Sequence, residues 1–166
     1  MFAALQVVAV VLVATAMAMS LAHALELPGK MRLRKDQYLT VQPIYYPGFT
    51  IGGGVGEFGG LLATLLLVFL TPGGTPASWL TLGAFVTLAV SHLLYWVLTH
   101  PVNNFWLANF ELKGWGATFF NLGRRGHGRS IDDDWTVLRN RWEYSHVARA
   151  ALAMLSLILI AAATAI

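Results

Sequence analysis

Four long apolar runs, separated by more polar segments, dominate the pattern of the chain. They cover residues 2–25, 51–70, 77–99 and 135–164. Each approaches or exceeds the roughly 20 residues that an α-helix needs to cross the hydrocarbon core of a bilayer. The fourth run begins with polar residues, so its first turns are expected to stand in water. The pattern predicts four membrane-spanning helices.

The segments between these runs predict how the helices are oriented. The turn TPGGTP contains two prolines and two glycines, which break a helix and join the second and third runs as an antiparallel pair. Lysine and arginine lie in the segments 27–50 and 101–134, and neither chain end nor the turn carries them. By the positive-inside rule, both charged segments are cytoplasmic and both termini lie outside. We expect an all-α fold: an integral membrane antiparallel four-helix bundle, one domain over residues 1–166, with a long cytoplasmic loop at 101–134.

Composition supports a membrane location. Hydrophobic residues make up 57% of the chain and charged residues 11%, whereas soluble domains have roughly 25% charged residues. The lipid bilayer is therefore the expected partner, in a bacterial inner (plasma) membrane, and the two basic clusters indicate orientation rather than binding to nucleic acid. The tripeptide AHA around His23 is similar to a signal-peptide cleavage site, but no lysine or arginine precedes it. The absence of cysteine excludes disulfides and thiolate metal sites.

Polar residues occur within or beside all four runs, where ionisable groups usually mark function or a buried partner. Helical spacing places them on one face of each helix: His23, Glu26 and Lys30; Glu57; His92, Trp96, Thr99 and Asn103; Arg139, Glu143, His146 and Arg149. Antiparallel helices bring these ends to one side, which predicts a shared polar cavity open to the cytoplasm. A simpler interpretation is that the arginines reach lipid phosphates and that Glu143 pairs with Arg139.

A stripe of small residues lies beside Glu57 in the second run. Gly52, Gly56 and Gly60 follow the small-xxx-small pattern that lets another helix approach closely. The neighbour could belong to the same chain or to a second copy in a homo-oligomer.

Three kinds of chemistry fit the polar residues. Glu143 and His146 have the Glu-x-x-His spacing of carboxylate-bridged di-iron helices. The metal ligands predicted for iron, copper or manganese are His23, Glu26, Glu57, Glu143 and His146. A haem between His92 and either His23 or His146 is a second option. In the third, a glutamate or histidine removes a proton from an acidic carbon or phenol, and the carbanion reacts directly with O2 while an arginine or histidine stabilises the anion.

Four stretches carry a resemblance to a known family: AHALELPGKMRL, YLTVQPIYYPGF, HPVNNFW and DDDWTVLRNRWEYSHVARA. They resemble the anthrone oxygenase-like family of small four-helix membrane proteins. The resemblance implies oxidation of an apolar phenolic anthrone to an anthraquinone with O2. The matching positions are His23, Glu26, Asn103, Arg139, Glu143, His146 and Arg149. Of these, Glu143, His146, Arg149 and Asn103 are the predicted catalytic residues.

The segment 104–134 is longer than the family pattern requires and mixes aromatic residues with a basic cluster. We expect it to lie on anionic lipid at the membrane interface, with a lid or a partner surface as alternatives. The run Asp132–Asp134 is expected to cap the fourth helix. The alternative to an enzyme is a small scaffold or accessory subunit. A transporter fits less well, because four helices without an inverted repeat give little room for alternating access.

Overall fold

The computed structural model describes residues 1–106 and 135–166, and this part of the chain consists of helices joined by short turns, without strands. The elements are α1 (Phe2–Lys30), α2 (Lys35–Val41), the 3-10 turn η1 (Gln42–Tyr45), α3 (Gly48–Leu70), α4 (Pro76–Leu94), the π-helical turn η2 (Tyr95–Thr99), α5 (His100–Trp106) and α7 (Trp135–Thr164). Four helical stretches are long and apolar enough to cross a membrane: Phe2–Lys30, Gly48–Leu70, Pro76–Asn103 and Trp135–Thr164. The predicted helical class and the four candidate spans are confirmed.

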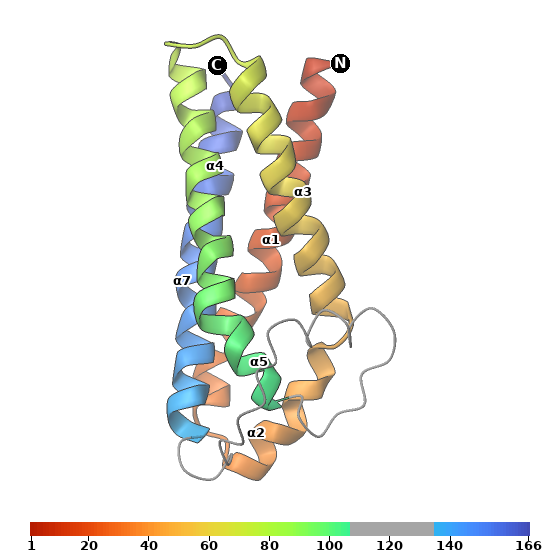
Figure 1. Ribbon diagram of the computed structural model, residues 1–166, viewed down its shortest axis with the longest axis vertical. Coiled ribbons are helices and arrows are strands. Elements are labelled where there is room, and N and C mark those ends of the chain that lie inside the picture. The colour runs from red at the N-terminus through yellow and green to blue at the C-terminus, as the bar shows by residue number, and fades with distance from the viewer. Residues whose placement is uncertain (107–134) are drawn as a thin grey trace.

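The four long helices lie side by side (Figure 1). Both chain termini and the connection between α3 and α4 lie at one end, and α2 and α5 lie at the other. α1 packs against α3 and α7, and α4 packs against the same two helices. The polar ends of α1 and α4 and the polar beginnings of α3 and α7 therefore come together at the end that carries α2.

Several predicted boundaries are wrong at that end. α1 continues past residue 25 to Lys30, with Pro28 inside its last turn. The segment 27–50 is not a loop, because it contains the end of α1, α2, η1 and the beginning of α3. The third helix does not end at residue 99 either. It continues through η2 and α5 to Trp106, with Pro101 inside this continuous helical stretch. The carbonyl oxygen of Val97, four residues before Pro101, accepts a hydrogen bond from the Arg141 side chain.

Two further predictions, the interfacial aromatic segment and the cap at Asp132–Asp134, fall within residues 107–134, outside the described part of the chain.

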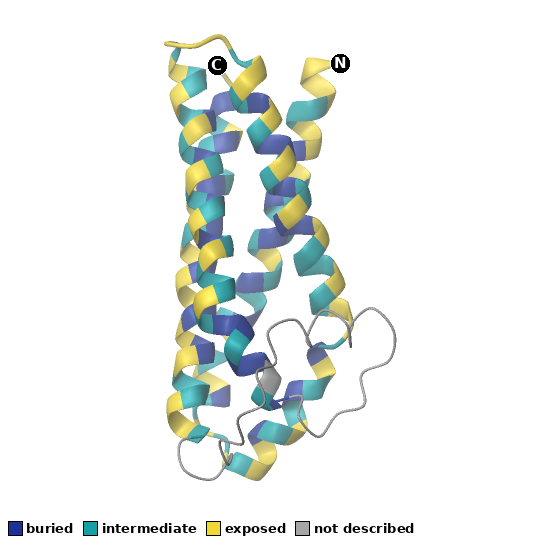
Figure 2. Ribbon diagram, in the orientation of Figure 1, coloured by how far each residue is buried: buried dark blue, intermediate teal, exposed yellow. Residues whose placement is uncertain are grey.

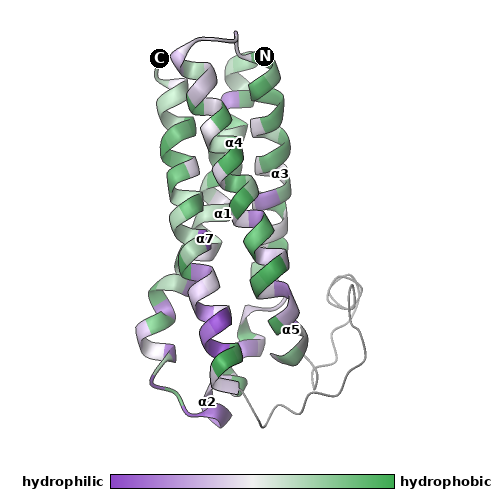
Figure 3. Cartoon of the chain, turned by 60° about the vertical axis from the view of Figure 1, so that its left-hand side comes forward, coloured by the Kyte–Doolittle hydropathy of each residue, from purple (hydrophilic) through white to green (hydrophobic). Residues whose placement is uncertain are grey.

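The distribution of side chains is that of a membrane protein. The core between the helices consists mainly of small or medium apolar residues: Ala9, Val13, Ala16, Ala63, Leu67, Ala84, Leu88 and Ile160. Large apolar side chains such as Leu62, Phe69 and Ile158 lie exposed on the outside, so buried and exposed positions alternate along each helix (Figure 2). Apolar residues extend along the bundle, and hydrophilic residues gather near α2 and α5 (Figure 3). Because so much exposed apolar surface is unfavourable in water, these helices indicate an integral membrane protein.

The glycine stripe of α3 packs within the chain. A Cβ at Gly56 would lie 2.6 Å from the backbone nitrogen and 3.0 Å from the Cα of Ala16 in α1. Gly52 faces Met19, and Gly60 faces Val13 and Leu88. The helix that the stripe admits is therefore α1, and no second copy is needed to explain it.

Gly56→Ala is expected to destabilise the protein by about 1–3 kcal/mol, because the two backbones must separate to admit the methyl group. The loss should occur although alanine favours a helix by about 1 kcal/mol over glycine. Thermal unfolding of the purified protein in detergent, followed by circular dichroism, measures the effect. Gly53→Ala is the matched control, because a Cβ there meets nothing within 4 Å. Equal stabilisation by both substitutions would contradict the close contact between α1 and α3.

Candidate functional site

Among the described residues, ionisable side chains from different helices form two groups that are mostly buried. The first, called the lysine cluster, consists of His23, Glu26, Lys30, Tyr38, Tyr45, Glu143 and His146. The second, called the arginine cluster, consists of Glu57, His92, Trp96 and Arg149.

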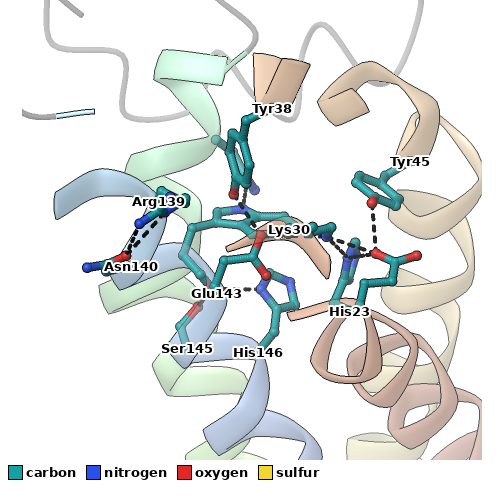
Figure 4. A network of polar contacts seen from close by, with 12 residues as sticks. His23, Lys30, Tyr38, Tyr45, Arg139, Asn140, Glu143, Ser145 and His146 are labelled. Atoms are coloured by element: carbon teal, nitrogen blue, oxygen red, sulfur yellow. Dashed lines mark hydrogen bonds and ion pairs between the residues drawn. The ribbon is translucent and has the colours of Figure 1, made fainter. Parts of the chain in front are cut away.

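Lys30 is the centre of the lysine cluster. It lies in the last turn of α1, yet its exposed fraction is only 4%. Its Nζ is 2.8 Å from Glu26 Oε2, 3.7 Å from Glu143 Oε1 and 3.4 Å from His23 Nδ1. Figure 4 shows Lys30 extending between Glu143 on one side and His23 and Tyr45 on the other. Burial of this ammonium group is possible because two carboxylates from different helices compensate its charge.

The rings of Tyr45 and Trp142 complete the surroundings of the Lys30 ammonium group. Its Nζ lies 4.4 Å from the centroid of Tyr45 and 4.8 Å from that of Trp142, within the range of cation–π attraction. The Tyr45 hydroxyl donates a hydrogen bond of 2.7 Å to Glu26 Oε2. Burial and this hydrogen bond raise the pKa of Tyr45 above its ordinary value, so the phenol is neutral and remains a donor.

Glu143 is fully buried, and its two carboxylate oxygens differ. Oε1 accepts a hydrogen bond of 2.8 Å from the hydroxyl of Tyr38, which α2 carries into the interior. Burial and the neighbouring Glu143 carboxylate raise the pKa of Tyr38, which keeps this phenol protonated. Oε2 has no hydrogen-bond partner within the described chain. The site thus contains a carboxylate with one fixed oxygen and one free oxygen.

His23 and His146 contact each other directly. Their ring centroids lie 4.4 Å apart. Nδ1 of His146 lies 2.9 Å from the carbonyl oxygen of Trp142. Because a carbonyl oxygen only accepts, this Nδ1 carries the proton, which leaves Nε2 as the basic nitrogen.

The arginine cluster forms a continuous chain of hydrogen bonds. Trp96 donates to Nε2 of His92 over 2.9 Å, and Nδ1 of His92 lies 2.7 Å from Glu57 Oε2. Because Nε2 accepts, Nδ1 carries the proton and donates it to the carboxylate. Arg149 donates to the other oxygen, Oε1 of Glu57. Both nitrogens of His92 are therefore engaged, which leaves none for the iron of a haem.

The predicted metal site is not assembled among the described residues. Glu57 belongs to the arginine cluster, and the other four predicted ligands, His23, Glu26, Glu143 and His146, belong to the lysine cluster. No three histidine, aspartate or glutamate side chains within residues 1–106 and 135–166 are grouped so that they could hold a metal ion. The physical reason is that the carboxylates are already paired, with Lys30 or with Arg149.

The predicted catalytic residues separate in the same way. Glu143 and His146 lie in the lysine cluster, whereas Arg149 holds Glu57. Asn103 accepts a hydrogen bond of 2.7 Å from the indole of Trp142 and so positions that ring beside Lys30. Arg139 donates its side-chain hydrogen bonds to Asn140 rather than to Glu143, the partner considered in the sequence.

Four residues of this region are absent from the predicted site: Lys30, Tyr38, Gln42 and Tyr45. Lys30 has a sequence signal, since it shares a helical face with His23 and Glu26. The other three are spaced by four and three residues, which puts them on one side of a helix. That spacing is informative only if the segment 27–50 is helical.

Several buried polar atoms at this end have no hydrogen-bond partner within the described residues. They include both amide atoms of Gln42, Nε1 of Trp106, Oε2 of Glu143 and Nε of Arg149. Gln42 is fully buried, and its backbone N–H donates to the carbonyl of Tyr38, so the two side chains share a face of the α2–η1 segment. Tyr38 in turn contacts the ring of Trp106, with centroids 5.3 Å apart. Buried polar atoms are rarely left unpaired because this is costly, so their concentration marks a place where a polar ligand would be stabilised.

Comparison of the chain with protein-family models, with curated proteins and with solved structures found no match. The function must therefore be inferred from the geometry of the two clusters.

Proposed function

We propose that the chain is a membrane-embedded oxygenase that oxidises an apolar phenolic substrate, such as an anthrone, with O2. The observation that carries this proposal is the carboxylate of Glu143. Its Oε1 is held by Tyr38 and faces Lys30, whereas its Oε2 is buried without a partner among the described residues. A carboxylate fixed through one oxygen and free at the other is suited to act as a general base.

The reaction follows from acid–base chemistry within the lysine cluster. Oε2 of Glu143 takes a proton from the acidic CH2 of the anthrone, and the electron pair delocalises onto the ring and its carbonyl oxygen. The Lys30 ammonium group, 3.7 Å from Glu143 Oε1, stabilises that negative charge. The carbon then forms a bond to O2, and Glu143 returns its proton to the resulting peroxide. The hydroperoxide then eliminates water, which takes the second hydrogen of the carbon and the outer peroxide oxygen, and the quinone carbonyl remains. One O2 therefore yields one quinone and one water.

The surroundings of the cluster suit an apolar aromatic substrate. Tyr38, Tyr45, Trp106 and Trp142 form one apolar cluster with Val102. In this proposal the four helices form an antiparallel bundle in a bacterial inner membrane, and the substrate enters laterally from the lipid. The end carrying Lys30, Arg32 and Arg34 faces the cytoplasm, in agreement with the positive-inside rule.

Two further considerations support proton abstraction. The resemblance to the anthrone oxygenase-like family rests partly on His23, Glu26, Glu143 and His146, which are all members of the lysine cluster. The pairing of Glu26 and Glu143 with Lys30 also favours a role as base over a role as metal ligand, because a bound cation would have to compete with the ammonium group.

Oxygen uptake tests the proposal. The purified protein in detergent micelles is given a hydroxylated anthrone, and O2 consumption and quinone absorbance are recorded together. We expect equal amounts of O2 consumed and quinone formed, at a rate well above that in protein-free micelles. Anthracene, which lacks the acidic CH2, should give no uptake. An anthrone rate no higher than that of empty micelles would reject the oxygenase and favour the scaffold alternative.

A further inference from the structure

We infer that Gln42, Trp106 and Glu143 recognise a neutral substrate that carries both a hydroxyl group and a carbonyl group. This inference rests on the proposed function in one respect, since it takes the lysine cluster and its aromatic neighbours as the substrate site. It goes further by naming the residues that select the substrate and by excluding anionic ligands.

The unpaired polar atoms of the site include both donors and acceptors. The Gln42 amide and the Trp106 indole offer two donor nitrogens that have no partner within the described residues, and Gln42 Oε1 and Glu143 Oε2 offer two acceptor oxygens. A carbonyl oxygen satisfies the donors, and hydroxyl groups satisfy the acceptors. If the oxygen and nitrogen of the Gln42 amide were exchanged, the set of unpaired donors and acceptors would stay the same, because neither atom has a partner among the described residues.

These atoms belong to one neighbourhood, and Tyr38 links them. Its hydroxyl donates to Glu143, and its ring contacts Trp106. Its backbone carbonyl accepts from Gln42, one helical turn further along the chain. Tyr45, which follows Gln42 by one 3-10 turn, contacts His23 with ring centroids 4.5 Å apart. Gln42 therefore lies between two tyrosines that both face the lysine cluster.

The charge balance of the site favours an uncharged ligand. Three cations lie at this level: Lys30, Arg139 and Arg149. Lys30 pairs with Glu26 and Glu143, and Arg149 pairs with Glu57. Arg139 donates to the side chain of Asn140 and lies over the Trp135 ring. Among the described residues at this level, the three carboxylates of Glu26, Glu57 and Glu143 balance these three cations. No positive charge is therefore in excess among them to compensate a ligand carboxylate, and a buried anion without a partner is strongly unfavourable. The ligand that fits is neutral.

Binding to three probes tests the inference without any turnover. They are a dihydroxyanthraquinone whose hydroxyls flank one carbonyl, an anthraquinone carboxylate without hydroxyls, and anthracene. Isothermal titration calorimetry on the full chain in nanodiscs, with empty nanodiscs as the blank, gives each Kd. We expect the dihydroxyanthraquinone to bind at least about tenfold more tightly than either other probe, because sites built around hydrogen bonds discriminate strongly against ligands that lack them.

Gln42→Leu should remove most of this preference and leave the Kd of anthracene unchanged. The variant is expected to fold, because leucine is close to glutamine in size and the substitution removes two buried polar atoms that have no hydrogen-bond partner among the described residues. Trp106→Phe, which removes the N–H donor and keeps an aromatic ring, should weaken dihydroxyanthraquinone binding in the same direction. Gln6→Leu is the matched control: it is the same substitution near the start of α1, and the N-terminus lies at the opposite end of the bundle from α2 (Figure 1). All three Kd values are expected to stay as in the wild type.

The outcomes separate this inference from the proposed function. A Gln42→Leu variant that keeps the full preference overturns the inference, and so does equal or tighter binding of the carboxylate probe. If the wild type nevertheless consumes O2 with an anthrone, the oxygenase proposal stands. If the preference depends on Gln42 but no O2 is consumed, the recognition site stands and the oxygenase does not.

Discussion

Glu143→Gln is expected to lower kcat by about 10²–10⁴-fold, the contribution typical of a positioned general base, while the protein keeps its fold. Glutamine has nearly the same shape, and its oxygen can still accept the hydrogen bond that Tyr38 donates to Glu143. Lys30 keeps a partner as well, because Glu26 Oε2 lies 2.8 Å from its Nζ. What the amide cannot do is take a proton from carbon. The loss should therefore appear chiefly in kcat. KM should rise by a smaller factor, because the amide NH2 that replaces Oε2 cannot accept a hydrogen bond from a substrate hydroxyl.

The measurement combines O2 uptake with thermal unfolding in the same detergent. Glu26→Gln is the control, because it removes the other carboxylate that faces Lys30 but leaves Glu143 in place. Its activity should stay within about tenfold of the wild type, below the range expected for loss of the base. Full activity of Glu143→Gln would show that Glu143 is not the base. A fall in activity that is matched by a fall in Tm would assign Glu143 a structural role instead.

The four candidate spans are predictable because their signal is local. The prolines and glycines of TPGGTP end a helix whatever surrounds them. The predicted fourth helix coincides with Trp135–Thr164. The structure of the residues beyond the first run is harder to predict. The burial of Lys30 depends on Glu143, which lies more than a hundred positions further along the chain. Without that partner a lysine after an apolar helix indicates a loop, which is why the pattern of the segment 27–50 misleads.

The division of the carboxylates between two clusters is also beyond the sequence pattern. Depth along a helix follows from its rise per residue, and it places Glu57 near the other polar groups. The direction in which a side chain points depends on helix rotation. Gly56 faces the backbone of Ala16 in α1, and the next residue is turned about 100° away on a helix with 3.6 residues per turn. Glu57 therefore faces α4 and α7, where His92 and Arg149 bind it.

Removing either partner of the Glu57–Arg149 pair is expected to destabilise the protein more than Gly56→Ala or Glu143→Gln. Both side chains are 7% exposed, and the pair lies within helices that we propose to cross the bilayer. Arg149→Leu leaves a buried carboxylate with only the neutral His92 as a partner. Glu57→Leu leaves a buried guanidinium group that has lost its carboxylate and keeps only its cation–π contact with Tyr95. Each single substitution should cost about 3–5 kcal/mol, the usual penalty for breaking a buried ion pair.

The double variant Glu57→Leu/Arg149→Leu should recover most of that loss, because no buried charge is left unpaired. The wild type, the two single variants and the double variant form a double-mutant cycle, and denaturant titration in mixed micelles gives the unfolding free energy of each. We expect the double variant to be more stable than the summed single losses by at least about 2 kcal/mol. Full recovery is not expected, because Nδ1 of His92 loses its acceptor on Glu57, at a cost of about 1–3 kcal/mol.

A second ion pair in the same chain provides the reference for this cycle. Arg34 and Asp36 lie 3.3 Å apart, but their side chains are 76% and 70% exposed. Arg34→Leu should therefore cost less than about 1 kcal/mol, as exposed pairs usually do. If the two single substitutions at Glu57 and Arg149 were equally mild, or if their effects simply added, the pair would not be held away from water. The same result would contradict the burial of the arginine cluster within the bundle, because burial is what makes an unpaired charge costly.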